Sequence, residues 1–389
     1  MVREWRLVVW LSLAQMISWG TLFYGFAVVV GPMERELGWA KTELYTAVTL
    51  GLLVAGAAAP FVGAWIDRHG GFWPMTLGSV GGGVLMIAWA FVDTPFALYV
   101  VWAAMGVVLA CTLYDPGFAV VAANVTDWKR GILVMTFLGG LASTAFIPLG
   151  HFLIETWDWR TALIALGAVN LVVCVAIHAY WLPGTRAKGK AAEAAEKDAT
   201  GSALGEAARK PAFWGLGVVW FAYNFASNTI TFHLIGMLGE RGVDPEAIVL
   251  VWAVIGPAQV LGRVALMGFA RIDPRYVGRY ALSALFVGIA ILASGADTIW
   301  ALLAFAAIYG TGNGLMTIVK GTIGPDLLGP RGYATVNGAL AMPSNVARAV
   351  APVAAAALWA AGGYSTVLAI LLAGLAGGLA VFWAITLRK

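Results

Sequence analysis

The sequence predicts an all-α membrane protein with twelve transmembrane helices in two pseudo-symmetric six-helix halves. Three observations support this prediction: the composition, twelve long apolar stretches, and one charged segment between the sixth and the seventh stretch. The chain of 389 residues is 61% hydrophobic and 11% charged. A soluble domain of this composition would have too few polar side chains to turn toward water. We therefore expect the chain to lie in a lipid bilayer.

The apolar stretches have the length that a membrane crossing requires. A hydrocarbon core of about 30 Å needs about 20 apolar residues in an α-helix. Strands of a transmembrane barrel would be shorter and would alternate polar with apolar residues, so helices are expected. The predicted spans are 6–30, 43–65, 72–92, 95–122, 132–154, 160–182, 211–237, 247–269, 276–294, 298–319, 333–358 and 364–386.

The charged segment divides the chain into three predicted parts. Residues 1–183 form the N-terminal six-helix half, residues 184–210 a linker rich in Ala, Glu and Lys, and residues 211–389 the C-terminal half. Lys and Arg near the ends of transmembrane helices collect on the cytoplasmic side. Both termini and the linker are therefore expected in the cytoplasm, because most basic residues fall on the side that holds the N-terminus. They are Arg3, Arg6, Arg68, Lys129, Arg130, Arg186, Lys188, Lys190, Lys197, Arg209, Lys210, Arg271, Arg275, Arg279, Arg331, Arg388 and Lys389.

Short segments of the first half recur in the second half in the same order. Glu36-Leu37-Gly38 corresponds to Glu240-Arg241-Gly242, and Arg130-Gly131 corresponds to Arg331-Gly332, at nearly the same offset. Two six-helix halves joined by a cytoplasmic linker are typical of transporters with parallel repeats, in which the substrate site lies between the halves. The pattern therefore predicts a transporter.

A motif between the second and third predicted spans supports this prediction. Gly63-Ala64-Trp65-Ile66-Asp67-Arg68-His69-Gly70 resembles the G-x-x-x-D-R-x-G signature of the major facilitator superfamily. In this motif Gly63 permits close helix approach, Asp67 can pair or cap at a cytoplasmic gate, Arg68 lies at headgroup level, and Gly70 allows a tight turn. The resemblance implies the major facilitator fold.

Further segments resemble the monocarboxylate transporter and oxalate:formate antiporter families. They are Ser18-Trp19-Gly20 with Tyr24, Leu37-Gly38-Trp39, Tyr114-Asp115-Pro116, Trp159-Arg160 and Gly262-Arg263. This resemblance implies that Arg263, in the eighth predicted span, binds the carboxylate of the substrate. Arginine suits that role because its planar guanidinium can donate two parallel hydrogen bonds.

Asp115, Arg263 and Arg348 are ionisable residues within the predicted spans, and Lys320 directly follows the end of one. Each costs about 2.5–3.5 kcal/mol at the bilayer centre, so each needs a partner or a watery cavity. Asp115 and Lys320 occupy matching places in the two halves and could form an ion pair that breaks during transport. A permanent buried pair, or a Lys320 side chain that snorkels to the interface, would explain them equally.

Other polar side chains follow helical spacing in the second half. Asn224 and Asn228 belong to a polar stripe on the seventh predicted span, together with Ser227 and Thr231. His233 lies in the same polar run and is either a proton carrier or a structural histidine. Asn345 and Arg348 are one helical step apart and are expected in one groove. Tyr24 and Tyr114 are expected in an aromatic wall.

These patterns predict a secondary transporter of a small organic anion, monocarboxylate-like, either proton-coupled or exchanging, that works by alternating access. The alternatives are an exporter of drugs or metabolites, a carrier of a vitamin-like ring compound, and a receptor built on a transporter fold. The sequence contains no G-x-x-x-x-G-K-[ST] loop, no catalytic cluster and no Cys/His metal cluster, so neither an enzyme nor a bound cofactor or metal is expected. We expect a monomer in the bacterial inner membrane that binds a small molecule, alone or together with protons, and does not bind nucleic acid.

Overall fold

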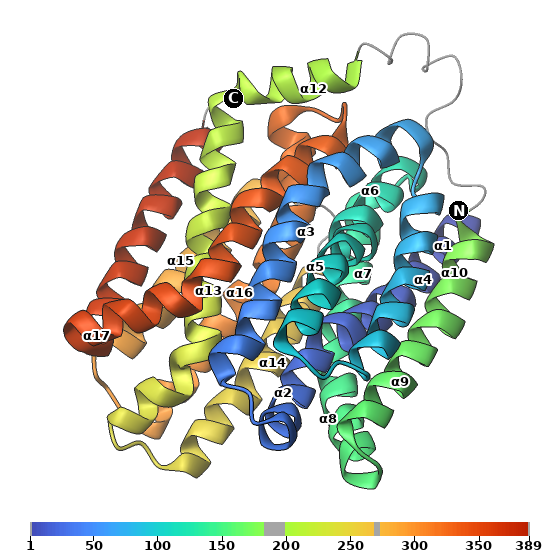
Figure 1. Cartoon of the computed structure of the whole chain (residues 1–389). Coiled ribbons are helices and arrows are strands. Elements are labelled where there is room, and N and C mark those ends of the chain that lie inside the picture. Colours follow the sequence, from blue (N-terminus) through green and yellow to red (C-terminus); the bar gives the residue numbers. More distant parts are fainter. Residues whose placement is uncertain (1, 183–198, 268–272, 388–389) are drawn as a thin grey trace. The chain divides into compact units, whose positions relative to one another are not determined.

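The computed structural model describes residues 2–182, 199–267 and 273–387, and all the regular elements in these ranges are helices (Figure 1). The chain divides into two compact units. Unit 1 comprises residues 1–205 and 331–342, and unit 2 comprises residues 206–330 and 343–389. Each unit is described separately below.

Unit 1 contains the helices that precede the linker. Its first membrane span is continuous from α1 (Val2–Ser18) through the π-helical turn η1 (Trp19–Phe23) to α2 (Tyr24–Leu37). The elements that follow are α3 (Lys41–His69), α4 (Phe72–Trp89), α5 (Pro95–Thr112), α6 (Tyr114–Asn124), α7 (Trp128–Gly140), α8 (Ala142–Thr156), α9 (Trp159–Val169), η2 (Asn170–Cys174) and α10 (Val175–Trp181).

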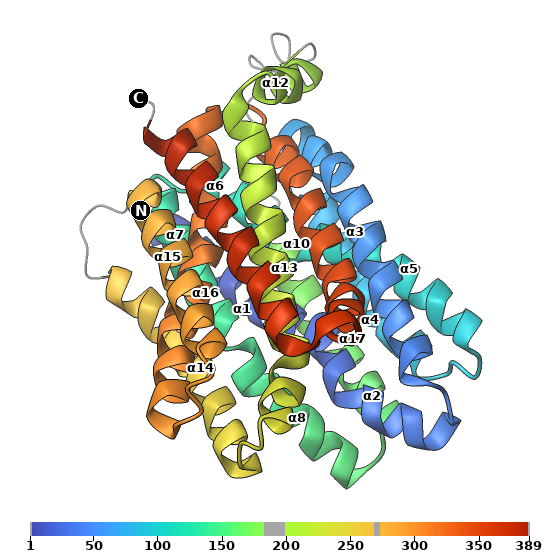
Figure 2. The same cartoon turned by 90° about the vertical axis from the view of Figure 1, so that its left-hand side faces the viewer.

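Unit 2 begins within α12 (Ala199–Ala208), the short helix that ends the linker. It continues with α13 (Pro211–Glu240), α14 (Pro245–Met267), α15 (Pro274–Ala293), α16 (Ile299–Leu328) and most of α17 (Tyr333–Leu387). Helix α17 is interrupted by non-helical backbone at Gly362 and Gly363, so it holds two spans. In Figure 2, α14, α15 and α16 lie beside one another, and α16 packs on both neighbours.

The helices account for the predicted twelve spans. Ten helical stretches in the described residues are long and apolar enough to cross a membrane, and the last of them is α17 with its two spans. Helix α13 has 30 residues, which is sufficient length, although its polar stripe lowers its hydropathy. The all-α prediction with twelve membrane helices is confirmed.

The fourth span, predicted at 95–122, is present at Pro95–Asn124, but its helix is interrupted at Leu113 between α5 and α6. Leu113 has an extended backbone with φ −78° and ψ −158°. Pro116 explains the break: in a continuous helix its ring would clash with the carbonyl of Thr112, and it has no N–H to bond that carbonyl. A discontinuous membrane helix therefore begins again at Tyr114.

Close helix packing in both units depends on glycines that face a neighbouring backbone. In unit 1 a Cβ at Gly51 would lie 2.8 Å from the carbonyl oxygen of Trp102, between α3 and α5. In unit 2 a Cβ at Gly310 would lie 2.7 Å from the carbonyl oxygen of Ile255, between α16 and α14. Lipid provides no hydrophobic driving force between helices, so small residues that allow such approach stabilise the packing.

Side-chain caps fix several helix starts outside the bilayer. Asp158, for example, accepts hydrogen bonds from the backbone N–H and the hydroxyl of Thr161, both at 2.8 Å, at the start of α9. The bond from the Thr161 backbone N–H holds the pKa of the Asp158 carboxyl below its usual value. Such caps satisfy backbone groups that the first helical turn leaves without partners.

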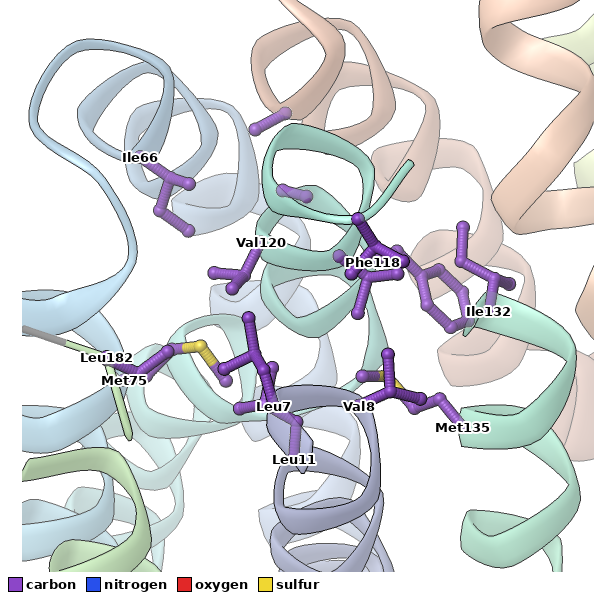
Figure 3. Close-up of a cluster of buried hydrophobic side chains, with 14 of the residues drawn as sticks. Leu7, Val8, Leu11, Ile66, Met75, Phe118, Val120, Ile132, Met135 and Leu182 are labelled. Atoms are coloured by element: carbon purple, nitrogen blue, oxygen red, sulfur yellow. The ribbon is translucent and has the colours of Figure 1, made fainter. Parts of the chain in front are cut away.

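A cluster of buried hydrophobic side chains joins one end of the helices of unit 1 (Figure 3). It contains Leu7, Val8 and Leu11 of α1 together with residues of α3, α4, α6 and α7. The first turn of α17 also belongs to it through Tyr333 and Ala334. The start of α17 is therefore part of the core of unit 1, and the gate motif lies directly beside it.

Candidate functional site

The predicted gate motif lies at the end of α3, next to the start of α17 within unit 1. The Asp67 carboxylate accepts hydrogen bonds from the backbone N–H of Ala334 at 3.1 Å and from the backbone N–H of Thr335 at 2.8 Å. The hydroxyl of Thr335 donates a third bond, also at 2.8 Å. Because the N-terminus of a helix has unpaired N–H groups and a positive dipole end, Asp67 caps α17.

The two glycines of the motif are required at their positions for different geometric reasons. A Cβ at Gly63 would meet the carbonyl group of Ala334 and lie 2.9 Å from the backbone nitrogen of Thr335. Gly70 ends α3 with φ +83°, a backbone conformation that glycine adopts easily and that residues with a Cβ atom rarely adopt. Arg68 is exposed beside them. A glycine of α17 completes the contact, because a Cβ at Gly338 would meet the carbonyl group of Ala59.

The predicted aromatic wall lies where the π-helical turn of the first span faces the start of α6. The ring of Trp19 lies 5.1 Å from Tyr114 and 6.3 Å from Tyr24, measured between centroids. Tyr114 in turn stacks on Phe118 at 5.2 Å. Trp19, Tyr24 and Tyr114 are each partly exposed. They form an aromatic patch in unit 1, which we define as Trp19, Phe23, Tyr24, Tyr114 and Phe118.

Gln15 of α1 holds the break in the fourth span. Its Nε2 atom donates to the carbonyl oxygen of Thr112 at 2.7 Å and to that of Leu113 at 3.1 Å. Gln15 is fully buried, and it supplies a donor to the Thr112 carbonyl, which Pro116 cannot bond. In the sequence, Gln15 is visible as an amide within an apolar span, but the residue whose carbonyl it bonds is 97 positions away.

Asp115 lies in the first turn of α6, and Lys320 lies on α16. Both side chains are partly buried. Asp115 belongs to unit 1 and Lys320 to unit 2, so their pairing stays a prediction from the internal repeat.

In unit 2 the polar stripe of α13 meets Arg348 of α17. The Nε atom of Arg348 donates to Oδ1 of Asn224 at 2.9 Å, and Asn224 is only 2% exposed. The amide groups of Asn224 and Asn228 bond the carbonyl oxygens of Trp220 and Asn224, both at 2.8 Å. Within the described part of the chain, Arg348 has this one hydrogen bond and no carboxylate within ion-pair distance. Its terminal guanidinium nitrogens are therefore available for an anion.

A second polar group joins α13 to α16. The hydroxyl of Tyr223 donates to Oδ1 of Asn313 at 2.7 Å, and the hydroxyl of Ser227 donates to the same oxygen at 3.1 Å. The sequence gives no reason to expect a site role for Asn313, because it is a single asparagine in the predicted span 298–319. Tyr309 extends the group by donating to Ser227 at 3.4 Å.

His233 and Asn345 lie on the same two helices as Asn224 and Arg348. The ring nitrogen Nε2 of His233 lies 3.0 Å from the carbonyl oxygen of Pro352, and its ring packs edge-on against Tyr364. Asn345 is partly buried one helical step from Arg348.

Arg263 is buried in the packing between α14 and α16. Its side chain is 4% exposed, and its Nε atom donates to the carbonyl oxygen of Gly314 at 3.2 Å. The neighbouring Gly262 would place a Cβ 3.0 Å from the Thr311 side chain. Arg263 is thus less accessible than Arg348, and its proposed contact with a substrate requires that α14 and α16 expose it.

Among the described residues, no group of three or more His, Cys, Asp and Glu side chains could hold a metal ion. The polar groups that meet on α13, α16 and α17 are amides, hydroxyls, the imidazole of His233 and the guanidinium of Arg348. They suit reversible binding of a polar solute by hydrogen bonds and charge.

Comparisons with known proteins agree with this arrangement. The model of the Major Facilitator Superfamily matches residues 11–352. An oxalate:formate antiporter of Oxalobacter formigenes is 27% identical over 211 residues, which are 52% of this chain and 48% of that protein. An MFS-type efflux pump of Mycolicibacterium smegmatis is 26% identical over 288 residues, 71% of this chain and 65% of the pump. The aligned region thus spans about half to two thirds of these relatives.

Two solved structures share the fold. The human organic anion transporter MFSD10 (TETRAN) superposes with a TM-score of 0.74 at 16% identity, over 97% of this chain and 99% of that chain. The proton:xylose symporter XylE, bound to 6-bromo-6-deoxy-D-glucose, superposes with a TM-score of 0.74 at 12% identity, over 100% and 96% of the two chains. The family model, the relatives and the membrane helices of the described residues lead to one conclusion: the chain belongs to the Major Facilitator Superfamily.

Proposed function

We propose that the chain is a secondary active transporter of a small organic anion, which it moves by alternating access in exchange or together with protons. The observation that supports an anionic substrate is the guanidinium of Arg348. Among the residues that the structure describes, no carboxylate pairs with this cation; an unpaired cation in a membrane span is costly, and an anionic substrate would supply the missing charge. Its Nε bond to Asn224 orients the planar fork that a carboxylate needs.

Arg263 is proposed as a second anion ligand, because Gly262-Arg263 resembles the corresponding segment of the monocarboxylate transporter and oxalate:formate antiporter families. The relative from Oxalobacter formigenes exchanges oxalate and formate by its name, which is consistent with a carboxylate substrate here. Asp115, Lys320 and His233 are proposed as coupling residues, because each can change its charge or its partner as a proton or substrate binds.

The test is uptake by proteoliposomes that contain the purified chain, measured with a panel of labelled mono- and dicarboxylates. We expect saturable uptake of an organic anion, and Arg348→Gln should reduce it about 10- to 100-fold, since a hydrogen bond to a charged group is worth about 1.5–3 kcal/mol. Arg263→Lys should also transport poorly, because an ammonium lacks the bidentate fork. A wild-type chain that transports only neutral or cationic solutes would exclude the anion assignment.

A planar ring compound, taken up or exported, is the second candidate. The aromatic patch supports it, because its partly exposed rings can stack on a flat substrate. The efflux pump among the relatives is consistent with export. Competition of flat aromatic acids against aliphatic acids of equal charge separates the candidates. Tyr114→Leu should weaken binding of the aromatic acids alone if the patch holds a ring.

We also propose that both termini and the linker face the cytoplasm of a bacterial inner membrane, from the distribution of Lys and Arg. Glu206 is exposed on α12 and provides a labelling position. In a variant that lacks Cys111 and Cys174, a cysteine introduced by Glu206→Cys should react with a membrane-impermeant maleimide only after the cells are opened. Reaction in intact cells would reverse the orientation. The transporter is proposed to work as a monomer.

A further inference from the structure

We propose that α15 and the last turns of α17 form a binding site for the phosphate of an anionic phospholipid headgroup, centred on Arg279. This site lies within unit 2, away from Asn224 and Arg348 in the sequence, and it does not depend on the transported substrate. The argument rests on how the guanidinium of Arg279 is held, where it lies along its helix, and which charges surround it.

The Arg279 side chain is fixed by three contacts. Its Nε atom donates to Oγ1 of Thr386 at 3.0 Å. Its guanidinium carbon lies 4.2 Å from the ring centroid of Trp383 and 5.5 Å from that of Tyr276. These contacts use the Nε atom and the face of the guanidinium. They leave its two terminal nitrogens, which form the bidentate edge.

Tight packing of α15 on α17 builds this arrangement. A Cβ at Gly278 would meet the ring of Phe382, which is itself fully buried. The glycine therefore lets the two helices approach at the level of Arg279. Trp383 and Thr386 follow Phe382 on α17, so the same approach brings the stacking ring and the hydroxyl to the guanidinium.

The position of Arg279 along α15 directs its charged end toward the membrane surface. α15 begins at Pro274, so Arg279 lies about 7.5 Å along the helix axis from its start. Side chains of a helix lean toward its N-terminus, which here is the near end of the span. A long arginine side chain can therefore reach the level of lipid phosphates while its methylene groups stay among apolar atoms.

The surroundings are basic and aromatic. Arg275 lies one helical turn closer to the surface on the same face, and among the described residues its side chain has no hydrogen bond or ion pair. The nearest acidic residue along α15, Asp273, uses its carboxylate to accept the backbone N–H of Arg275 at 2.9 Å. Tyr276 and Tyr280 are 68% and 60% exposed, as expected of rings in the headgroup region.

A comparison with Arg160 of unit 1 shows what is different at Arg279. Arg160 also lies over an aromatic ring, 4.3 Å from the centroid of Trp159, but it forms ion pairs with Glu36 at 3.2 Å and Asp93 at 3.5 Å. In the described part of the chain, Arg279 has the ring contacts without a carboxylate. Because an oriented guanidinium at headgroup level matches a phosphate, the anion here is expected to come from lipid.

The experiment measures lipid binding to the purified full-length chain in detergent by native mass spectrometry, together with its thermal unfolding. The probes are phosphatidylglycerol and phosphatidylcholine with the same acyl chains. Wild type should bind phosphatidylglycerol at least fivefold more tightly than phosphatidylcholine and unfold at a higher temperature with it. Arg279→Gln should remove most of this preference, and Arg279→Lys should recover only part of it.

Arg241→Gln is the matched control, since Arg241 is also an interfacial arginine of unit 2 but already pairs with Asp297 at 3.2 Å. This control should keep the preference for phosphatidylglycerol. Equal binding of both lipids by wild type, or an unchanged preference in Arg279→Gln, would overturn the proposal. Inorganic phosphate that displaces phosphatidylglycerol at millimolar concentration would show a site for free anions and overturn the lipid assignment. If Arg279→Gln does not fold, Arg275→Gln provides the test. Its preference for phosphatidylglycerol over phosphatidylcholine should fall about twofold to threefold, and an unchanged preference would overturn the proposal.

Discussion

Arg348 donates a 2.9 Å hydrogen bond from Nε to the Oδ1 atom of Asn224, so the second part of the chain presents a held guanidinium on α17 beside the polar stripe of α13. The two residues are 124 positions apart in the sequence. Asn224 is nearly inaccessible, whereas Arg348 is partly exposed. The asparagine thus positions the arginine, and the arginine is the group that can meet a ligand.

Two substitutions of Asn224 distinguish its effect on the orientation of Arg348 from an effect on the charge of Arg348. Asn224→Leu removes the acceptor and should raise the KM for an anionic substrate severalfold, because Arg348 loses its orientation. Asn224→Asp places a carboxylate at the same point, which should pair with Arg348 and reduce anion uptake at least tenfold. Uptake kinetics in proteoliposomes check this. Equal losses in both variants would exclude competition for the charge of Arg348.

Gln15 is predicted to be a positioning residue for Tyr114 and Asp115. Gln15→Met has a similar volume but cannot bond the carbonyls of Thr112 and Leu113, and an unsatisfied buried polar group costs about 1–3 kcal/mol. We expect at least a tenfold loss of transport and faster hydrogen exchange at residues 113–118. In Gln15→Glu the introduced carboxyl can donate a bond only when protonated, so transport should fall as pH rises more steeply than in wild type.

Ser12→Ala is the control for Gln15. Ser12 is also fully buried on α1, but its hydroxyl donates to the carbonyl oxygen of Val8 in its own helix at 2.6 Å and not to the fourth span. This variant should keep normal hydrogen exchange at residues 113–118. If Gln15→Met behaves like Ser12→Ala in both measurements, the positioning role is wrong.

Gly63→Ala should destabilise the contact between α3 and α17. The added methyl group would overlap the backbone of Ala334 and Thr335, and overpacking typically costs about 1–3 kcal/mol. Gly374→Ala is the matched substitution, because no atom lies within 4 Å of a Cβ at that membrane-helix position. Thermal unfolding should show a lower midpoint for Gly63→Ala alone. Similar midpoints for the two variants would contradict the close approach at Gly63.

A double-mutant cycle tests the predicted pairing of Asp115 with Lys320. Removing one partner of a buried ion pair leaves the other charge uncompensated, which is worse than removing both. Asp115→Asn and Lys320→Gln should therefore each reduce transport, and the double variant should recover part of the loss. Simple addition of the two effects would mean that the residues do not interact. Asp115 would then remain a candidate proton carrier, testable from the pH profile of Asp115→Asn.

The sequence by itself determined the membrane fold and the family, because both depend on features that are local in the chain. The spans follow from apolar stretches of sufficient length, and the motif Gly63 to Gly70 is contiguous. Polar side chains in these spans were recognised as unusual, since a charge or an amide is costly in lipid wherever the rest of the fold lies.

The tertiary structure alone decided the partners of these side chains. Asp67 caps a helix that begins more than 260 residues later, and Gln15 holds a break that Pro116 produces in another span. Arg263 and Arg348 are the same residue type in similarly apolar stretches, yet one is buried between α14 and α16 and the other remains partly exposed beside Asn224. Hydrogen bonds and burial depend on which helix faces meet in space, and periodicity in one helix does not contain that information.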